Sequence, residues 1–201
     1  MVETPVRRLL RREERHASIL HAAAGAFART GFAATSMEDV AEACGVTKLI
    51  VYRHFDSKEE LYRAILQRVF DRQAEELVRG LERPGQSGLG ARTLLTVARE
   101  EPDGFTLLWR HAPREPQFAA YAQELRSMSV AAVRDLMAIA SHDPVFDAWT
   151  AEVVIGWLVE AVLTWLEVGA ADRDEEMVRW STDGLRRMRA GWVDATMPFS
   201  P

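Results

Sequence analysis

Residues 35–55 read TSMEDVAEACGVTKLIVYRHF and contain two short helical patterns with a break between them. Apolar residues recur at helical spacing over 37–43, residues 44–46 interrupt the pattern, and a second short helix is expected over 47–54. Gly45 suits the interruption, because a tight turn needs a positive φ that only glycine adopts at low cost. Two short helices joined by a three-residue turn have the spacing of a helix-turn-helix.

Helical periodicity continues on both sides of this stretch, and no segment alternates long enough to predict a strand. The first helix carries the stripe Ile19, Ala23 and Phe27 and is expected to end near Gly31. Ser57 begins the fourth helix, where Glu60 is placed to complete a capping box. Prolines then start further helices. The sequence predicts an all-α protein of about nine helices, the later ones over 57–82, 89–100, 102–111, 116–141, 145–169 and 174–192.

Composition narrows the class of protein. The chain has 201 residues, 48% hydrophobic and 27% charged, which is typical of a soluble globular protein. A single cysteine, Cys44, excludes a disulfide framework and a cysteine-based zinc site, and the histidines show no ligand spacing, so no metal or cofactor is expected. No nucleophile–base pattern or glycine-rich phosphate loop is present, which argues against an enzyme.

Charge and hydropathy indicate where the protein acts. Residues 1–68 carry a net charge of +2 and the remainder −7, so a polyanion is expected to bind the N-terminal end. The longest apolar region, 153–168, is interrupted by Glu160, Thr164 and Glu167, which argues against a membrane span. The expected compartment is the cytoplasm.

Motifs around the helix-turn-helix support a family resemblance. They are Ile19-Leu20-His21-Ala22-Ala23, Gly31-Phe32, Tyr52-Arg53-His54-Phe55 and Ser57-Lys58-Glu59-Glu60-Leu61. In order and spacing, residues 15–66 resemble the N-terminal domain of the tetracycline-repressor (TetR) family of bacterial transcription regulators. The resemblance implies a DNA-binding domain over 1–56 and a helical ligand-binding and dimerisation domain over 57–201, with 57–82 as the connecting helix.

The resemblance and the side-chain chemistry together select residues for a double-stranded DNA operator. Thr47 and Lys48 begin the second helix of the motif and are expected to reach base edges. Leu49 departs from the family pattern, and a leucine there would either touch a thymine methyl or restrict approach to the backbone. The predicted DNA-binding residues are Thr35, Ser36, Thr47, Lys48, Leu49, Tyr52, Arg53, His54 and Lys58.

The last two helices favour a homodimer. Polar residues of the segment 151–168 fall in a narrow arc, so this helix is expected to bury two faces. Such a pair of helices from each subunit would form a four-helix interface, although an internal core helix in a monomer gives the same pattern. The predicted dimerisation residues are Trp157, Leu158, Trp165, Met177, Trp180, Leu185 and Met188.

Aromatic residues in the C-terminal part suit a mostly apolar ligand cavity, and they equally suit a filled core. The predicted ligand-binding residues are Phe105, Trp109, Phe118, Tyr121, Trp157 and Trp165. The favoured function is a homodimeric repressor released from a palindromic operator by a small apolar or aromatic effector. The alternative is a helix-turn-helix regulator without a small-molecule ligand, controlled by a protein partner or constitutive.

The arginine-rich opening leaves two interpretations. Its five arginines are either a solvated helix face or an arm that adds phosphate or minor-groove contacts. They are Arg7, Arg8, Arg11, Arg12 and Arg15.

Overall fold

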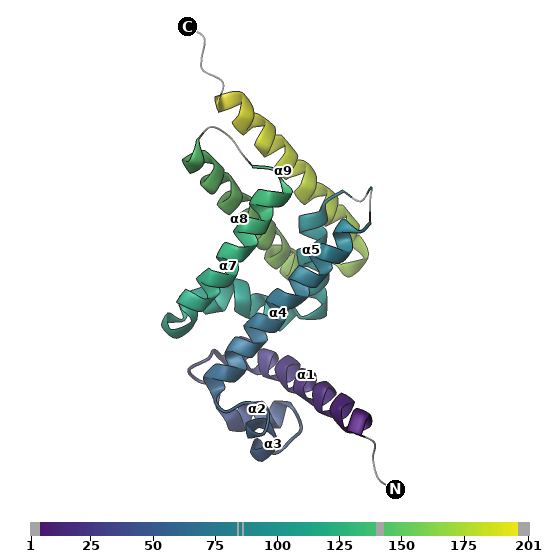
Figure 1. Cartoon of the computed structure of the whole chain (residues 1–201), viewed down its shortest axis with the longest axis vertical. Coiled ribbons are helices and arrows are strands. Elements are labelled where there is room, and N and C mark those ends of the chain that lie inside the picture. Colours follow the sequence, from purple (N-terminus) through teal and green to yellow (C-terminus); the bar gives the residue numbers. More distant parts are fainter. Residues whose placement is uncertain (1–4, 84, 86, 140–142, 197–201) are drawn as a thin grey trace. The chain divides into compact units, whose positions relative to one another are not determined.

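The computed structural model describes residues 5–83, 85, 87–139 and 143–196, without the side chains of residues 5–11 and 193–196. Every regular element within these ranges is a helix (Figure 1), which confirms the all-α prediction. The α-helices are α1 (Pro5–Thr30), α2 (Met37–Ala43), α3 (Lys48–Tyr52), α4 (Lys58–Leu81), α5 (Leu89–Glu100), α6 (Pro102–Thr106), α7 (Pro116–Leu136), α8 (Pro144–Val168) and α9 (Asp174–Thr196).

Several helix starts lie where the sequence predicts them. Pro102 and Pro144 occupy the first turns of α6 and α8, where a missing N–H costs nothing. At the start of α4, the Ser57 hydroxyl accepts a hydrogen bond from the Glu60 N–H at 3.0 Å. The Glu60 carboxylate, however, accepts from the N–H of Asp56 at 2.6 Å, so the predicted capping box is only half formed.

The helix predicted over 102–111 is not one regular helix. After α6 the chain widens into a π-helical turn, η1 (Leu107–His111), and then tightens into a 3-10 turn, η2 (Ala112–Arg114). Pro113 lies in η2 and provides the physical reason. It has no N–H to donate, and in an α-helix its ring would clash with the carbonyl group of residue 109.

Helix α7 ends earlier than the predicted residue 141. Its last residue is Leu136, and Ala138 then adopts a left-handed φ of 47°. The N–H of Ile139 donates to the carbonyl of Arg134 at 3.0 Å, which closes the helix end as a Schellman-type turn. Residues 140 and 141 lie outside the described residues.

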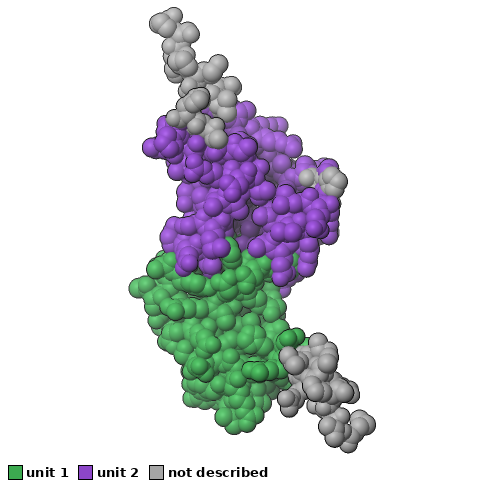
Figure 2. Space-filling model, viewed as in Figure 1, with its two compact units in different colours: residues 1–72, 101–122 green, residues 73–100, 123–201 purple. Residues whose placement is uncertain are grey.

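The chain forms two compact units (Figure 2). Unit 1 comprises residues 1–72 and 101–122, and unit 2 comprises residues 73–100 and 123–201. In unit 2, α5, α8 and α9 pack against one another. The division predicted after residue 56 separates DNA binding from ligand binding and dimerisation, whereas units 1 and 2 are defined by compactness alone. That functional division stays a prediction.

The core of unit 1 is aromatic. Tyr62 of α4 stacks on Phe118 of α7 with ring centroids 4.3 Å apart, and Phe27 and Phe32 meet Tyr62 edge-on at 5.1 and 5.2 Å. Burial raises the pKa of the Tyr62 hydroxyl. Edge-on and stacked ring pairs stabilise the folded state beyond the contribution from burying their apolar surface. The start of α7 is therefore part of the core on which the helix-turn-helix packs.

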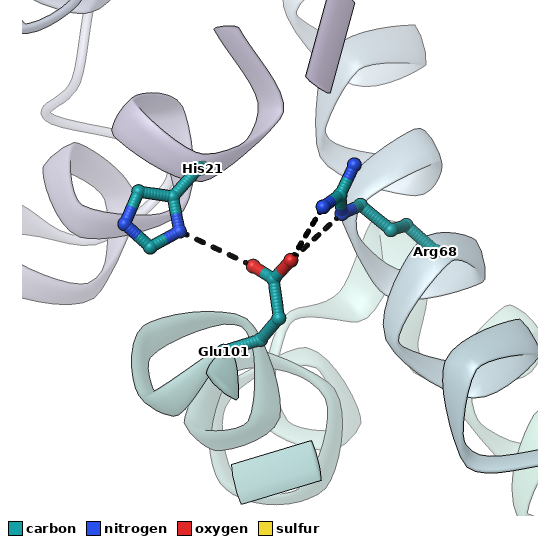
Figure 3. Close-up of polar contacts among 3 residues, drawn as sticks. All are labelled: His21, Arg68 and Glu101. Carbon is teal, nitrogen blue, oxygen red and sulfur yellow. Dashed lines mark hydrogen bonds and ion pairs between the residues drawn. The ribbon is translucent and has the colours of Figure 1, made fainter. Parts of the chain in front are cut away.

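Segment 101–106 is fixed to α1 and α4 by polar and close contacts (Figure 3). The Glu101 carboxylate accepts two hydrogen bonds from Arg68 of α4, at 2.7 and 2.9 Å, and lies 3.3 Å from Nδ1 of His21 on α1. Gly104 allows α6 to approach α4 closely, since a Cβ there would lie 2.7 Å from the side chain of Val69. These contacts hold α6 inside unit 1.

Candidate nucleic-acid interface

The turn between α2 and α3 has the predicted geometry. Gly45 adopts a φ of 63°, and its N–H donates to the Glu42 carbonyl at 3.0 Å. The N–H of Val46 donates to the carbonyl of Ala41, also at 3.0 Å. Val51 on α3 is fully buried, so one face of this helix packs on the unit and fixes which side chains face outward.

The opposite face of α3 is exposed. Leu49 is 62% and Tyr52 41% exposed, and Thr47, Lys48 and Arg53 are exposed as well. These are five of the nine residues predicted to bind DNA. An exposed helix face that combines a hydroxyl, cations and an apolar tip is what major-groove recognition requires.

Lys48 has a partner within the motif. Its ammonium group forms an ion pair with Glu38 of α2 and lies 5.5 Å from the centre of the Tyr52 ring. The hydrogen bond between the Lys48 ammonium group and the Glu38 carboxylate raises the pKa of Lys48 and lowers the pKa of Glu38. The positive charge of Lys48 is therefore already compensated by the Glu38 carboxylate when no DNA is bound.

Three other predicted DNA-binding side chains make contacts inside the protein. The buried Thr35 hydroxyl donates to the Gly31 carbonyl at 2.7 Å. Ser36 caps α2: its hydroxyl accepts from the N–H of Asp39 at 3.1 Å, and its own N–H donates to the Asp39 carboxylate at 2.8 Å. The Ser36 N–H and the Ser36 hydroxyl both donate to the Asp39 carboxylate at 2.8 Å, and these two bonds lower the pKa of Asp39. The Ser-x-x-Asp spacing is a capping signal that the sequence analysis missed.

Lys58 is the third. Its ammonium group donates to the carbonyls of Phe32 and Thr35, both at 2.9 Å, and lies 4.3 Å from the centre of the Phe32 ring. Lys58 thus ties the start of α4 to the loop before α2. Its predicted role at DNA, like those of Thr35 and Ser36, stays a prediction.

His54 follows α3 and is half-buried. Its ring lies 5.8 Å from that of His16 on α1, measured between centroids. Burial is the main cause that lowers the pKa of His54, followed by the nearby positive groups His16, Arg12 and Arg15. The imidazole is therefore neutral near pH 7 and presents one N–H donor.

The predicted ligand residues lie in both units. Phe105 and Phe118 are fully buried in unit 1, and the Tyr121 hydroxyl donates to the Gln67 side chain. The Trp109 indole N–H, also in unit 1, is buried without an acceptor. No single unit brings all six together, because the remaining two residues, Trp157 and Trp165, belong to unit 2.

The seven predicted dimerisation residues all lie in unit 2 and differ in exposure, and two of them, Trp165 and Met188, are half-buried. Leu158, Met177 and Leu185 are buried within the protomer. Trp157 and Trp180 remain 42% and 54% exposed. The exposed rings leave apolar surface on α8 and α9.

Trp165 is held by polar contacts within unit 2. Its indole N–H donates to Asp174 at 2.7 Å, and Asp174 also accepts from Arg99 at 2.8 and 3.1 Å. Arg99 is the main cause that lowers the pKa of Asp174. This network fixes the beginning of α9 against α5.

Among the described residues no group of His, Cys, Asp or Glu side chains is arranged to hold a metal ion. Within the described ranges no helix is both long and apolar enough to cross a membrane.

The exposed helix α3, joined to α2 by the turn at Gly45, defines the chain as a helix-turn-helix DNA-binding protein. Residues 19–65 match the family model for bacterial regulatory proteins of the tetR family. The transcriptional activator FasR of Mycolicibacterium smegmatis is 33% identical over 154 residues, which cover 72% of this chain and 67% of FasR. The chain belongs to the TetR family of transcriptional regulators.

Other relatives match over shorter ranges or in fold. The repressor KstR2 of Rhodococcus jostii is 38% identical over 72 residues, 34% of this chain and 35% of KstR2. A TetR-like regulator from Rhodococcus sp. RHA1 has the same fold, with a TM-score of 0.71 and 23% identity over 88% of this chain and 96% of that one. AibR, solved with isovaleryl coenzyme A and operator DNA, gives a TM-score of 0.60 and 22% identity over 84% and 96% of the two chains.

Proposed function

We propose that this regulator binds a palindromic operator as a homodimer and acts as a repressor that a small, largely apolar effector releases. The observation that carries the proposal is the exposed face of α3, with Thr47, Lys48, Leu49, Tyr52 and Arg53 turned away from the core. A palindrome places two such helices in major grooves about 34–36 Å apart, which requires two subunits.

The exposed rings of Trp157 and Trp180 support the dimer. Exposed tryptophans on adjacent helices are unusual on a monomer surface and typical of interface centres. Trp180 is further oriented by Trp165, whose ring meets it edge-on at 6.0 Å, and by Arg173, 5.6 Å from its centre. A second copy of α8 and α9 would cover this surface.

The buried indole N–H of Trp109 supports an effector. A buried donor without an acceptor costs about 1–3 kcal/mol, and an oxygen atom of a bound ligand would relieve that cost. AibR, which has the same fold, binds an acyl thioester and operator DNA. A change in DNA affinity of ten- to a hundredfold would need only about 1.4–2.8 kcal/mol of coupling between the two sites.

The alternative, a regulator without a small-molecule ligand, is favoured by a different observation. Phe118 stacks on Tyr62, and the Tyr121 hydroxyl is bonded to Gln67, so both predicted ligand residues are used in the core of unit 1. A thermal-shift screen with lipophilic compounds separates the two functions. A compound that raises the Tm and lowers operator affinity supports the effector, and a panel without such a compound favours the alternative.

The first test is fluorescence anisotropy on labelled DNA from beside the protein's own gene, over a range of salt concentrations. Binding that exceeds binding to scrambled DNA, at two subunits or a multiple per site, is the expected result. Trp180→Lys should shift the protein towards monomers in analytical ultracentrifugation and weaken operator binding. Leu136→Lys, at an exposed position of α7, is the control that should change neither. An unchanged dimer in Trp180→Lys would argue against this interface.

A further inference from the structure

The helix-turn-helix itself has little positive charge with which to bind DNA. Residues 35–58 contain three lysine and arginine residues and four carboxylates, a net charge of −1. Duplex DNA carries one negative charge per about 1.7 Å of its axis, and sequence-independent affinity comes from cations that replace its counterions. The motif therefore needs cations from another part of the chain.

Two of the motif's three cations are also engaged by the protein. Lys48 is paired with Glu38, and Lys58 donates to the carbonyls of Phe32 and Thr35. Each would have to give up these contacts before it could bind a phosphate. The competition weakens the electrostatic contribution of the motif further.

The N-terminal half of α1 has the missing charge. Residues 5–16 contain five arginines against Glu13 and Glu14, a net charge of +3. Arg12 and Arg15 are exposed. The helix continues without interruption from Pro5, so Arg12 and Arg15 lie on a helix and not on a loop.

Ring contacts place this charge beside the end of α3. His16 stacks on Phe55 with centroids 4.7 Å apart and lies 5.8 Å from His54. Arg12 is one helical turn before His16 and therefore shares its face of α1. The positive charges of Arg12 and Arg15 also lower the pKa of His54, as expected for groups close to that ring.

We infer that the N-terminal half of α1 forms a second DNA-contact surface, in which Arg12 and Arg15 bind backbone phosphates next to those reached from the recognition helix. This surface provides most of the sequence-independent affinity, while α3 reads the bases. Arginine suits the task, since its guanidinium presents several donors to phosphate oxygens and stays charged. The inference rests on the proposed DNA binding of the full chain.

The test compares the full-length protein with Arg12→Ala/Arg15→Ala on a scrambled, fluorescein-labelled duplex over a salt series. Loss of two phosphate contacts in each subunit, four in the proposed dimer, should reduce the slope of log K against log salt by about 3.6. Between ~50 and ~200 mM salt, the affinity of the unaltered protein should then fall about 150-fold more than that of the variant. Arg79→Ala/Arg83→Ala removes the same charge from exposed positions of unit 2 and is the matched control.

The outcomes are distinct. A reduced slope in Arg12→Ala/Arg15→Ala alone, with the preference for the operator over scrambled DNA retained and an unchanged circular dichroism spectrum, supports the inference. An unchanged slope, or the same reduction in the control, overturns it and assigns the arginines to a solvated helix face. Failure of the unaltered protein to bind any duplex at low salt would instead overturn the proposed function.

Discussion

Glu38 of α2 and Lys48 of α3 form an ion pair across the helix-turn-helix, on the side from which the protein would meet DNA. Both side chains are largely exposed, so the pair contributes little to folding. Its effect is on binding, because DNA phosphates must compete with a carboxylate that is already in place.

Glu38→Gln should raise the affinity for duplex DNA. The change keeps the shape of the side chain, frees Lys48 and removes a negative charge that faces the phosphates. The expected gain is up to about fivefold at low salt, the size of one exposed ion pair, and it should shrink as salt increases. Anisotropy titrations measure it, with the exposed Glu124→Gln on α7 as the control. A lower affinity in Glu38→Gln would mean that Glu38 itself supports the complex.

Tyr52→Phe should weaken operator binding by about 1 kcal/mol, the usual contribution of one hydrogen bond. The exposed hydroxyl is suited to a phosphate oxygen, while the ring keeps its position under Lys48. Sedimentation should show the same oligomeric state as the unaltered protein. If the variant changes that state, the effect on DNA binding has another cause.

Ser36→Ala should lower the free energy of unfolding by about 1 kcal/mol, because it removes the cap of α2. Urea titration followed by circular dichroism measures the change. Ser127→Ala is the control, since that hydroxyl bonds only to the Gln123 carbonyl one turn earlier in α7. A loss of DNA affinity without loss of stability would assign Ser36 to the DNA contact and not to the cap.

Asp174 should make stability depend on pH. Arg99 and Trp165 hold its pKa below the ordinary 3.8, so its contribution to stability is complete above that value and is lost as the pH falls through the lower folded-state pKa. Asp174→Asn should cost about 1 kcal/mol at neutral pH. The difference in Tm between the two proteins should stay constant above pH ~5 and narrow below pH ~4. A constant difference down to pH ~2.5 would contradict the assignment.

Ala138→Gly should stabilise the protein by about 0.5–1 kcal/mol, because residue 138 has a left-handed φ that glycine adopts without the cost paid by alanine. Ala131→Gly, at an exposed position inside α7, should have the opposite sign and a similar size. Thermal melts of the two variants provide a direct comparison. If Ala138→Gly destabilised the protein as Ala131→Gly does, the left-handed φ of residue 138 would not be a source of strain that glycine relieves.

Local sequence patterns predict much of the helix-turn-helix. Gly45 and the apolar spacing on either side fix the turn, and Pro102 and Pro144 fix two helix starts, since each acts through its own backbone geometry. The π-helical turn Leu107–His111 was not predicted, although Pro113 signals a break in that segment. Pro113 accounts for the break in the α-helix, and the sequence contains no signal that selects a π-helical turn before it.

Other site features depend on residues far apart in sequence. The positive charge of Lys58 suggests a phosphate contact, yet its ammonium group donates to carbonyl groups 23 and 26 residues earlier in the chain. Glu101 joins α1 and α4 across separations of 80 and 33 residues. A single sequence has no local signal for such pairs, so they become visible only once the helices are packed.

The stacking of Phe118 on Tyr62 has a consequence for protein engineering. A chimaera that joined only residues 1–72 of this chain to the remainder of another regulator would lack Phe118. It would have a hole beside Tyr62 and Phe32, in the core that Phe27 also lines. A working chimaera would have to carry residues 101–122 along with residues 1–72, so the transplantable part is discontinuous in the gene.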